Sequence, residues 1–211
     1  METIITGDIV NSRDVESEIW LSPLKTLFTE IAFSEKDWDI FRGDSFQISV
    51  MPEEAFRIAV LIKSAIKKIR NKNIDVRMAI GIGESDRRVS KVSESTGEAF
   101  VYSGELLDTL TQKDVHLGIK TPWKRIDDEF NMMFKLALIV LNSWTVNTSE
   151  VAYVLFKTPE ITQTELAKKF SLAQSTINAR IKRGSVYEIA ELETYYKMRI
   201  SEKIDTPYGT T

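Results

Sequence analysis

Two aspartates in the first fifty residues have side chains suited to a metal or phosphate site. Asp8 belongs to a Gly-Asp turn expected after a strand-like stretch at residues 1–6, and Asp44 lies at the tip of a predicted hairpin. Two carboxylates and a backbone carbonyl, here that of Ile9, make the oxygen site that Mg²⁺ prefers and usually shares with substrate phosphates. A purely structural explanation stays equally open, because aspartate is also a common turn-capping and hairpin-turn residue.

A second group of chemically useful residues lies near the C-terminus. Residues 162–170 predict a short helix, in which Thr162 caps the N-terminus and Glu165 completes a capping box. A tight turn at residues 171–172 follows, and residues 173–184 predict a second helix. The two elements together have the lengths of a helix-turn-helix.

The second of these helices has one apolar face and one polar face. Ile177 and Ile181 are four residues apart and share the buried face, and Gly184 supplies the stop. The other face carries hydrogen-bond donors and acceptors that suit base edges and phosphates. The residues predicted to contact DNA are Gln174, Ser175, Thr176, Asn178, Arg180, Lys182 and Arg183.

The charge of this segment supports the same interpretation. Residues 161–184 hold five basic side chains against one acidic side chain, whereas the whole chain has a net charge of -3. A local basic cluster in an acidic protein is typical of a DNA-binding surface. The segment resembles the helix-turn-helix of bacterial DNA-binding proteins, although a helical hairpin that contacts another protein would show a similar pattern.

The hydrophobic pattern predicts the elements that must position these residues. Up to about residue 120 the order is strand, helix, two strands, helix, strand, helix and strand, which begins as the split βαβ, ferredoxin-like arrangement of an α+β domain. The strands are predicted at residues 1–6, 38–41, 46–50, 76–82 and 115–119, the helices at 19–33, 52–70 and 97–110, and a loop at 85–95.

The remainder of the chain is predicted to be all-α. Helices are expected at residues 128–144, 149–157, 162–170, 173–184 and 187–204. The sequence therefore predicts two domains, a ferredoxin-like domain at residues 1–126 and a helical helix-turn-helix domain at residues 127–211.

Three segments of the first domain resemble known enzymes. Residues 42–46 (RGDSF), 76–83 (VRMAIGIG) and 97–100 (GEAF) are similar to the catalytic palm of class III nucleotidyl cyclases and of diguanylate-cyclase (GGDEF) domains. The resemblance covers about residues 1–120. It implies a palm fold that binds a nucleotide and Mg²⁺ and that pairs with a second copy.

The sequence departs from those enzymes at the positions that perform their chemistry. Val101 and Glu105 stand where active cyclases carry an Asn and an Arg for the transition state, and Ile40 stands at the position of the base-recognising Lys. The second acid of the diguanylate-cyclase hairpin is Ser45 here. Because nucleotidyl transfer depends on positioned positive charge, these departures indicate a degenerate cyclase-like domain.

The chain as a whole resembles the SatD family of bacterial proteins. Residues 6–13, 42–47, 79–83 and 95–104 carry that resemblance. It implies a palm-like domain joined to a helix-turn-helix, with no assured activity.

Composition limits the remaining classes of protein. The chain has no cysteine, which excludes disulfides and thiolate metal sites, and its single histidine, His116, is expected to be an ordinary edge residue. No signal-peptide pattern and no long apolar run occur, so a cytoplasmic location without a membrane span is expected.

Two functions follow as hypotheses. The first is a DNA-binding, transcriptional-regulator-like protein whose cyclase-like domain senses a nucleotide or makes a homodimer that reads a palindrome. The alternative is a metal-dependent nucleotidyl or phosphoryl transferase that uses Asp8 and Asp44.

Overall fold

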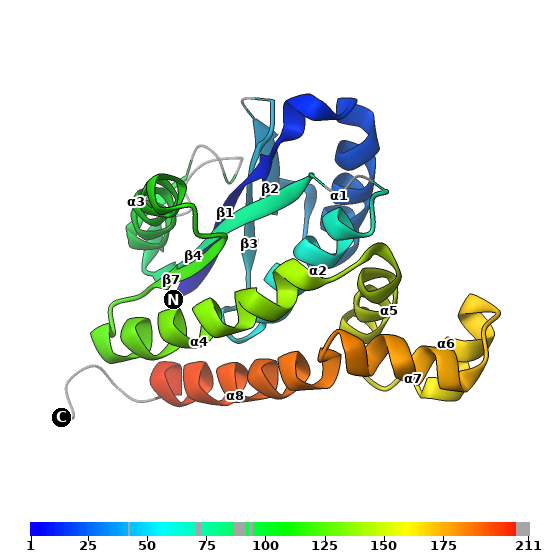
Figure 1. Ribbon diagram of the computed structural model, residues 1–211. Helices are drawn as coiled ribbons and strands as arrows, with labels where there is room; N and C mark the ends of the chain where they lie inside the picture. The colour runs from blue at the N-terminus through cyan, green and yellow to red at the C-terminus, as the bar shows by residue number, and fades with distance from the viewer. Residues whose placement is uncertain (42, 71–72, 87–91, 93–94, 206–211) are drawn as a thin grey trace.

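The computed structural model describes residues 1–41, 43–70, 73–86, 92 and 95–205 (Figure 1). It has an α+β part with a five-stranded sheet, followed by a helical part. Arg42 of the predicted hairpin lies outside the described residues. None of the helices in the described ranges is long and apolar enough to cross a membrane.

The sheet has the strand order β2-β3-β1-β4-β7. All neighbouring strands are antiparallel except β4 and β7, which are parallel. The strands are β1 (Glu2–Val10), β2 (Trp38–Phe41), β3 (Ser45–Val50), β4 (Asp75–Gly83) and β7 (Leu117–Lys120), and β5 (Ser85–Asp86) pairs with β6 (Thr96–Gly97) in a separate small sheet. The three helices of this part are α1 (Ser17–Ile31), α2 (Ala55–Lys67) and α3 (Glu98–Lys113), with short 3-10 turns at Ser12–Asp14, Glu35–Asp37 and Pro52–Glu54.

The first strand is longer than predicted, and the turn expected at Gly7 and Asp8 is wrong. Both residues lie inside β1, where Asp8 is opposite Ser45 on one side and Arg77 on the other. A strand with a neighbour on each side forms backbone hydrogen bonds along both of its edges. These hydrogen bonds outweigh the local turn preference of the Gly-Asp pair. The loop expected at residues 85–95 likewise contains a strand, β5, at its start.

Side chains alternate between the two faces of the sheet. Ile5 and Ile9 belong to the main core with residues of α1 and α2, whereas Ile4 packs with Ala99 and Phe100 of α3. Thr6, on the α3 face, donates a hydrogen bond to Ser103. Gly81 permits this close contact, because a Cβ there would stand 2.2 Å from the carbonyl oxygen of Ala99 in α3.

Five helices follow the sheet. They are α4 (Lys124–Ser143), α5 (Val146–Lys157), α6 (Gln163–Phe170), α7 (Gln174–Arg183) and α8 (Val186–Asp205). Figure 1 shows α4 and α8 lying side by side, with α5, α6 and α7 grouped at one end. The domain boundary predicted at residue 126 falls within the first turn of α4, and a division at that point stays a prediction.

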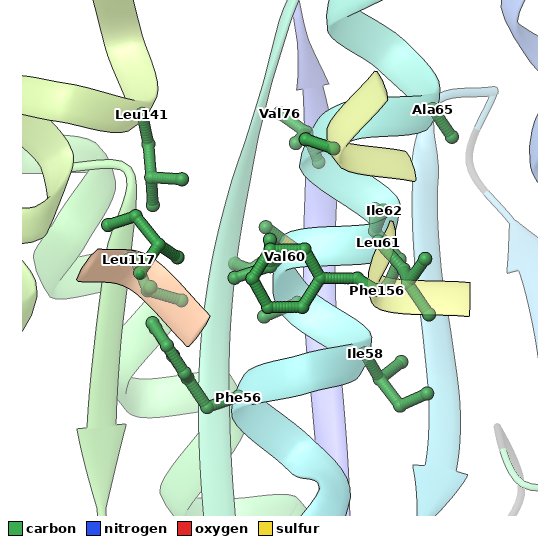
Figure 2. Packing of buried hydrophobic residues seen from close by; sticks show 14 of the residues in the cluster. Phe56, Ile58, Val60, Leu61, Ile62, Ala65, Val76, Leu117, Leu141 and Phe156 are labelled. Carbon is green, nitrogen blue, oxygen red and sulfur yellow. The ribbon is translucent and has the colours of Figure 1, made fainter. Parts of the chain in front are cut away.

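An aromatic junction, formed by Phe56, Phe130, Phe134 and Tyr196, joins the helical part to α2. The rings of Phe56 and Phe134 are stacked with centroids 4.9 Å apart, and those of Phe130 and Tyr196 meet edge to face at 5.0 Å. All four side chains are fully buried. The junction belongs to one core that includes residues of α2, β4, β7, α4 and α5 (Figure 2).

A buried ion pair makes a second link between the sheet and α4. Lys63 of α2 lies 2.8 Å from Asp75 and donates a 2.7 Å hydrogen bond to the side chain of Asn142 in α4. His116, expected to be an ordinary edge residue, is instead half-buried with Nδ1 3.3 Å from Asp75. Burial alone would raise the pKa of Asp75, but the contact with His116 and the charge of Lys63 outweigh it and hold that pKa well below its usual value.

This ion pair should make the free energy of unfolding depend on pH. Because the folded-state pKa of Asp75 is depressed, its contribution is complete above pH ~4, the unfolded value, and declines as the pH falls below that value. Asp75→Asn leaves Lys63 buried without its partner and should lower the free energy of unfolding at neutral pH by about 3–5 kcal/mol. Urea denaturation between pH ~7 and ~3 should show a flatter pH dependence in this variant than in wild type. The exposed Asp108→Asn is the control, and equal slopes in wild type and Asp75→Asn would contradict the assignment.

The aromatic junction should dominate the stability of the helical part. Phe134→Ala removes a fully buried, stacked ring and should lower the free energy of unfolding by about 3–5 kcal/mol. Met132→Ala, on the same helix but with a side chain 60% exposed, should change it by less than about 0.5 kcal/mol. Equal effects of the two substitutions in denaturant titrations would show that the junction does not hold α4 in place.

Candidate nucleic-acid interface and the aspartate pair

The capping box predicted at the start of α6 is present. The backbone N–H of Glu165 donates to the Thr162 hydroxyl at 3.2 Å, and the backbone N–H of Thr162 donates to the Glu165 carboxylate at 2.8 Å. The backbone N–H and the hydroxyl of Thr162 both donate to the Glu165 carboxylate, and these two hydrogen bonds lower the pKa of Glu165. The box satisfies two N–H groups that the helix itself leaves unpaired, and so fixes where α6 begins.

The turn between α6 and α7 is tight, as predicted. Ser171 adopts the left-handed conformation with φ of 53°, and Leu172 donates its N–H to the carbonyl of Ala167 at 2.9 Å. Leu166 is fully buried, as is Ile177 on the facing side of α7. The turn and these apolar contacts set α7 across α6, so that one face of α7 looks outward.

The structure exposes most of the residues predicted to contact DNA. Ile177 and Ile181 hold the inner face of α7, and their burial turns the polar residues outward. Asn178 and Arg180 are half-buried. The exposed members of the predicted set are Gln174, Ser175, Thr176, Lys182 and Arg183.

Arg180 differs from the other predicted contacts. Its guanidinium lies 3.6 Å from the carboxylate of Glu150 in α5, and only 17% of its side chain is exposed. The spacing of Ile177 and Ile181 could not show this, because the partner comes from another helix. In this structure Arg180 ties α7 to α5.

One exposed residue of α7 is absent from the set of DNA contacts predicted from the sequence. Ala179 is exposed on α7 between Ser175 and Lys182, which are four residues before it and three after it. The i, i+4, i+7 spacing of these three residues was the available signal. A small side chain at this position lets the backbone of α7 come close to a surface laid against it.

Gly184 ends α7 as predicted, although it is not itself in the left-handed conformation. Its φ is -90°, and Ser185 takes the left-handed conformation at 45° instead. Glycine is required for space, since a Cβ at residue 184 would lie 2.2 Å from a methyl group of Thr148 in α5. The carbonyl of Gly184 also accepts a buried 2.7 Å hydrogen bond from the indole N–H of Trp144. The end of α7 is thereby fixed against the α4–α5 corner.

The chain continues from α7 into α8 without a wing. In the described chain up to residue 205, the last strand is β7, which precedes all of the C-terminal helices. The start of α8 is buried at Val186 and Ile189, and Tyr196 carries the same helix into the aromatic junction. A long helix therefore occupies the chain position at which a winged domain forms a β-hairpin.

The two aspartates lie at one cavity. Asp8 and Asp44 both line a hollow of about 410 Å³ at the end of β1. The backbone N–H of Ile9 donates to the carbonyl of Asp44 at 3.1 Å, and the hydroxyl of Ser12 donates to the Asp44 carboxylate at 2.5 Å. The sequence argument that the strand and the hairpin would bring these residues together is therefore consistent with the geometry.

A third residue changes the chemistry of the pair. Arg77 of β4 contacts both carboxylate oxygens of Asp8, at 3.1 and 3.3 Å, and the hydroxyl of Thr111 at 3.2 Å. Burial raises the pKa of Asp8, Arg77 lowers it, and the nearby charge of Asp44 raises it, with a raised pKa as the net result. Nothing in the sequence pattern pointed to Arg77 as the partner of Asp8.

These contacts bear on the predicted Mg²⁺ ligands Asp8, Ile9 and Asp44. A guanidinium on the Asp8 carboxylate takes the oxygen positions that a divalent cation needs and repels the cation. Among the described residues, no group of three or more acidic or histidine side chains is arranged to hold a metal ion. The residues as placed do not fit Mg²⁺.

Comparison with known proteins agrees with the C-terminal geometry. Residues 153–183 match the family model of winged helix-turn-helix DNA-binding domains. The matched residues run from the second half of α5 through α6 to the end of α7. A comparison with curated proteins gives no match. The chain thus carries a helix-turn-helix of the DNA-binding class in its C-terminal part.

The close approach at Gly184 gives a direct test of how α7 is anchored. Gly184→Ala should lower the free energy of unfolding by about 1–3 kcal/mol, because the added methyl group overlaps Thr148. Gly104→Ala, within α3 and with no atom within 4 Å of the new Cβ, should raise it by about 0.4–1 kcal/mol. Thermal or urea unfolding of both variants measures the contrast, and a neutral Gly184→Ala would argue against the observed contact.

Proposed function

We propose that this protein binds DNA through α7 and acts as a transcriptional-regulator-like protein. The observation that carries the proposal is the outward first turn of α7, where Gln174, Ser175 and Thr176 are exposed. Residues at the N-terminal end of a recognition helix are those that reach base edges in the major groove. The match of residues 153–183 to a DNA-binding family supports this assignment.

Charge on the same surface supports binding to the phosphate backbone. Lys182 and Arg183 are exposed at the end of α7, and Lys168 and Lys169 are exposed on α6. These cations precede and follow the exposed turn along the chain, and exposed cations of this kind fit phosphates of a DNA backbone. Glu165 is the single acidic residue of residues 161–184, and its carboxylate already accepts a hydrogen bond from Thr162 in the capping box.

The role proposed for the first domain is that of a degenerate, palm-like ferredoxin domain that senses a nucleotide or makes a homodimer. Its support is the order β4-β1-β3-β2 with antiparallel neighbours, which follows from a βαββαβ chain of the split type. The position of Asp44 beside Asp8 is a second support. A nucleotide ligand and a homodimer stay predictions of the sequence.

Two ion pairs weigh against a metal-dependent transferase that uses Asp8 and Asp44. Arg77 already occupies the carboxylate of Asp8, and Glu105 forms a 2.7 Å ion pair with Lys120. A carboxylate at Glu105 places negative charge where nucleotidyl transfer needs positive charge.

The proposal is tested by changing the charges at the end of α7. The double variant Lys182→Gln, Arg183→Gln should bind a random-sequence duplex more weakly. The slope of log affinity against log salt should become shallower by about 0.9 for each phosphate contact that is lost. Lys113→Gln, an exposed lysine at the end of α3, should bind as wild type does.

Fluorescence anisotropy at several salt concentrations measures these affinities. A folded wild-type protein that binds no DNA at low salt would contradict the proposed function. Wild-type-like binding by the double variant would show that DNA is held by a surface other than α7.

A further inference from the structure

A cavity lies where the end of α2 meets the corner between α4 and α5. Its volume is about 440 Å³, which is within the range of small-molecule sites. It is bounded by the end of α2, the residue before β4, and the corner between α4 and α5. The residues that define it here are Lys67, Ile69, Arg70, Ile74, Trp144 and Val146.

Most of the cavity surface is apolar, although Thr145 and Asn147 also line it. Ile74 and Trp144 are 2% and 3% exposed, and Ile69 and Val146 are half-buried beside them. Burying an apolar group of a ligand against such walls is favourable in proportion to the area removed from water. The cavity therefore selects a molecule with an apolar body.

Two cations line the same cavity. Lys67 donates a 2.9 Å hydrogen bond to the backbone carbonyl of Asn142, and its charge has no carboxylate partner in the described part of the chain. Arg70 is exposed and makes no hydrogen bond or ion pair with any described residue. A guanidinium that is free to form two parallel hydrogen bonds is well suited to a carboxylate.

One wall of this cavity also anchors the recognition helix. Trp144 lines the cavity, and its indole N–H donates the 2.7 Å buried hydrogen bond to the carbonyl of Gly184 at the end of α7. Val146, a second wall residue, begins α5, and α5 also contacts α7 through Glu150 and Arg180. A molecule that moves Trp144 therefore acts on the contact that fixes the end of α7.

We infer that this cavity binds a small organic acid, with a carboxylate on an aliphatic or aromatic body, and that its occupancy changes the affinity of α7 for DNA. The carboxylate lies at Arg70 and Lys67, and the body lies against Ile74 and Trp144. The second half of this inference rests on the proposed DNA binding, whereas the first half does not. An acid changes DNA affinity only to the extent that its own affinity differs between the DNA-bound and the DNA-free protein.

The first experiment measures binding of the acid without DNA. Calorimetric titrations of the full chain use octanoate and 1-naphthoate as probes, with octanol and 1-naphthalenemethanol as neutral counterparts of similar shape. Wild type should bind the acids and not the alcohols. Arg70→Gln should weaken acid binding about tenfold or more, the effect of losing a charge-assisted hydrogen-bonded contact.

A matched variant controls for the loss of one positive charge. Lys25→Gln changes an exposed cation on α1, away from the cavity, and should leave acid binding unchanged. Arg70 is exposed, so its substitution leaves the core intact. No binding of either acid by folded wild type would overturn the inference. Equal binding of acid and alcohol, or unchanged binding by Arg70→Gln, would overturn the assignment of the anion site.

The second experiment measures DNA affinity with and without saturating acid. Wild type should change its affinity at least about fivefold, the lower end of ordinary coupling between two sites. Trp144→Phe keeps a ring in the wall and removes the N–H bond to Gly184, so it should bind the acid but lose the effect on DNA. A wild-type DNA affinity that saturating acid leaves unchanged would overturn the regulatory half.

The outcomes also separate this inference from the proposed function. A wild-type protein that binds the acids but no DNA would refute the proposed function and the regulatory half, while confirming the site. A protein that binds DNA but no acid would refute the site and leave the proposed function standing.

Discussion

The stacking of α4 on α2 through Phe134 and Phe56 is the contact on which the rest of the arrangement depends. The ring of Tyr196 packs against both and brings α8 to the same place. Since α8 follows α7 directly and Trp144, at the end of α4, bonds to Gly184, the C-terminal end of α7 is held by two helices fixed in one junction. The direction in which α7 points is therefore set by the core, in addition to the short turn between α6 and α7.

Much of the helix-turn-helix could be predicted because its signals are local. The capping box needs only Thr162 and Glu165 three residues apart, and the inner face of α7 needs only Ile177 and Ile181 four apart. The order of strands and helices was similarly predictable from apolar spacing. At Gly7 and Asp8 the local sequence favoured a turn, but the pairing of β1 with a strand on each side made them part of the strand.

The features that could not be predicted depend on contacts between distant residues. Arg77 contacts Asp8 from the neighbouring strand β4, and Arg180 of α7 contacts Glu150 of α5. Gly184 was predicted as the end of the helix, but the sequence could not show that glycine is needed there to leave room for Thr148. In each case the residue type was visible in the sequence, but its partner was fixed only by the packing of elements that are far apart along the chain.

The replacement of a wing by α8 has a consequence for how much sequence one molecule can read. A winged domain adds contacts beside the groove, whereas here the outward surface is one helix with a few exposed side chains. Three or four side chains distinguish roughly four base pairs, and a given run of that length recurs by chance about every 250 base pairs. The information needed to mark one place in a genome therefore exceeds what a single α7 carries, and it has to be assembled from several contacts along the same DNA.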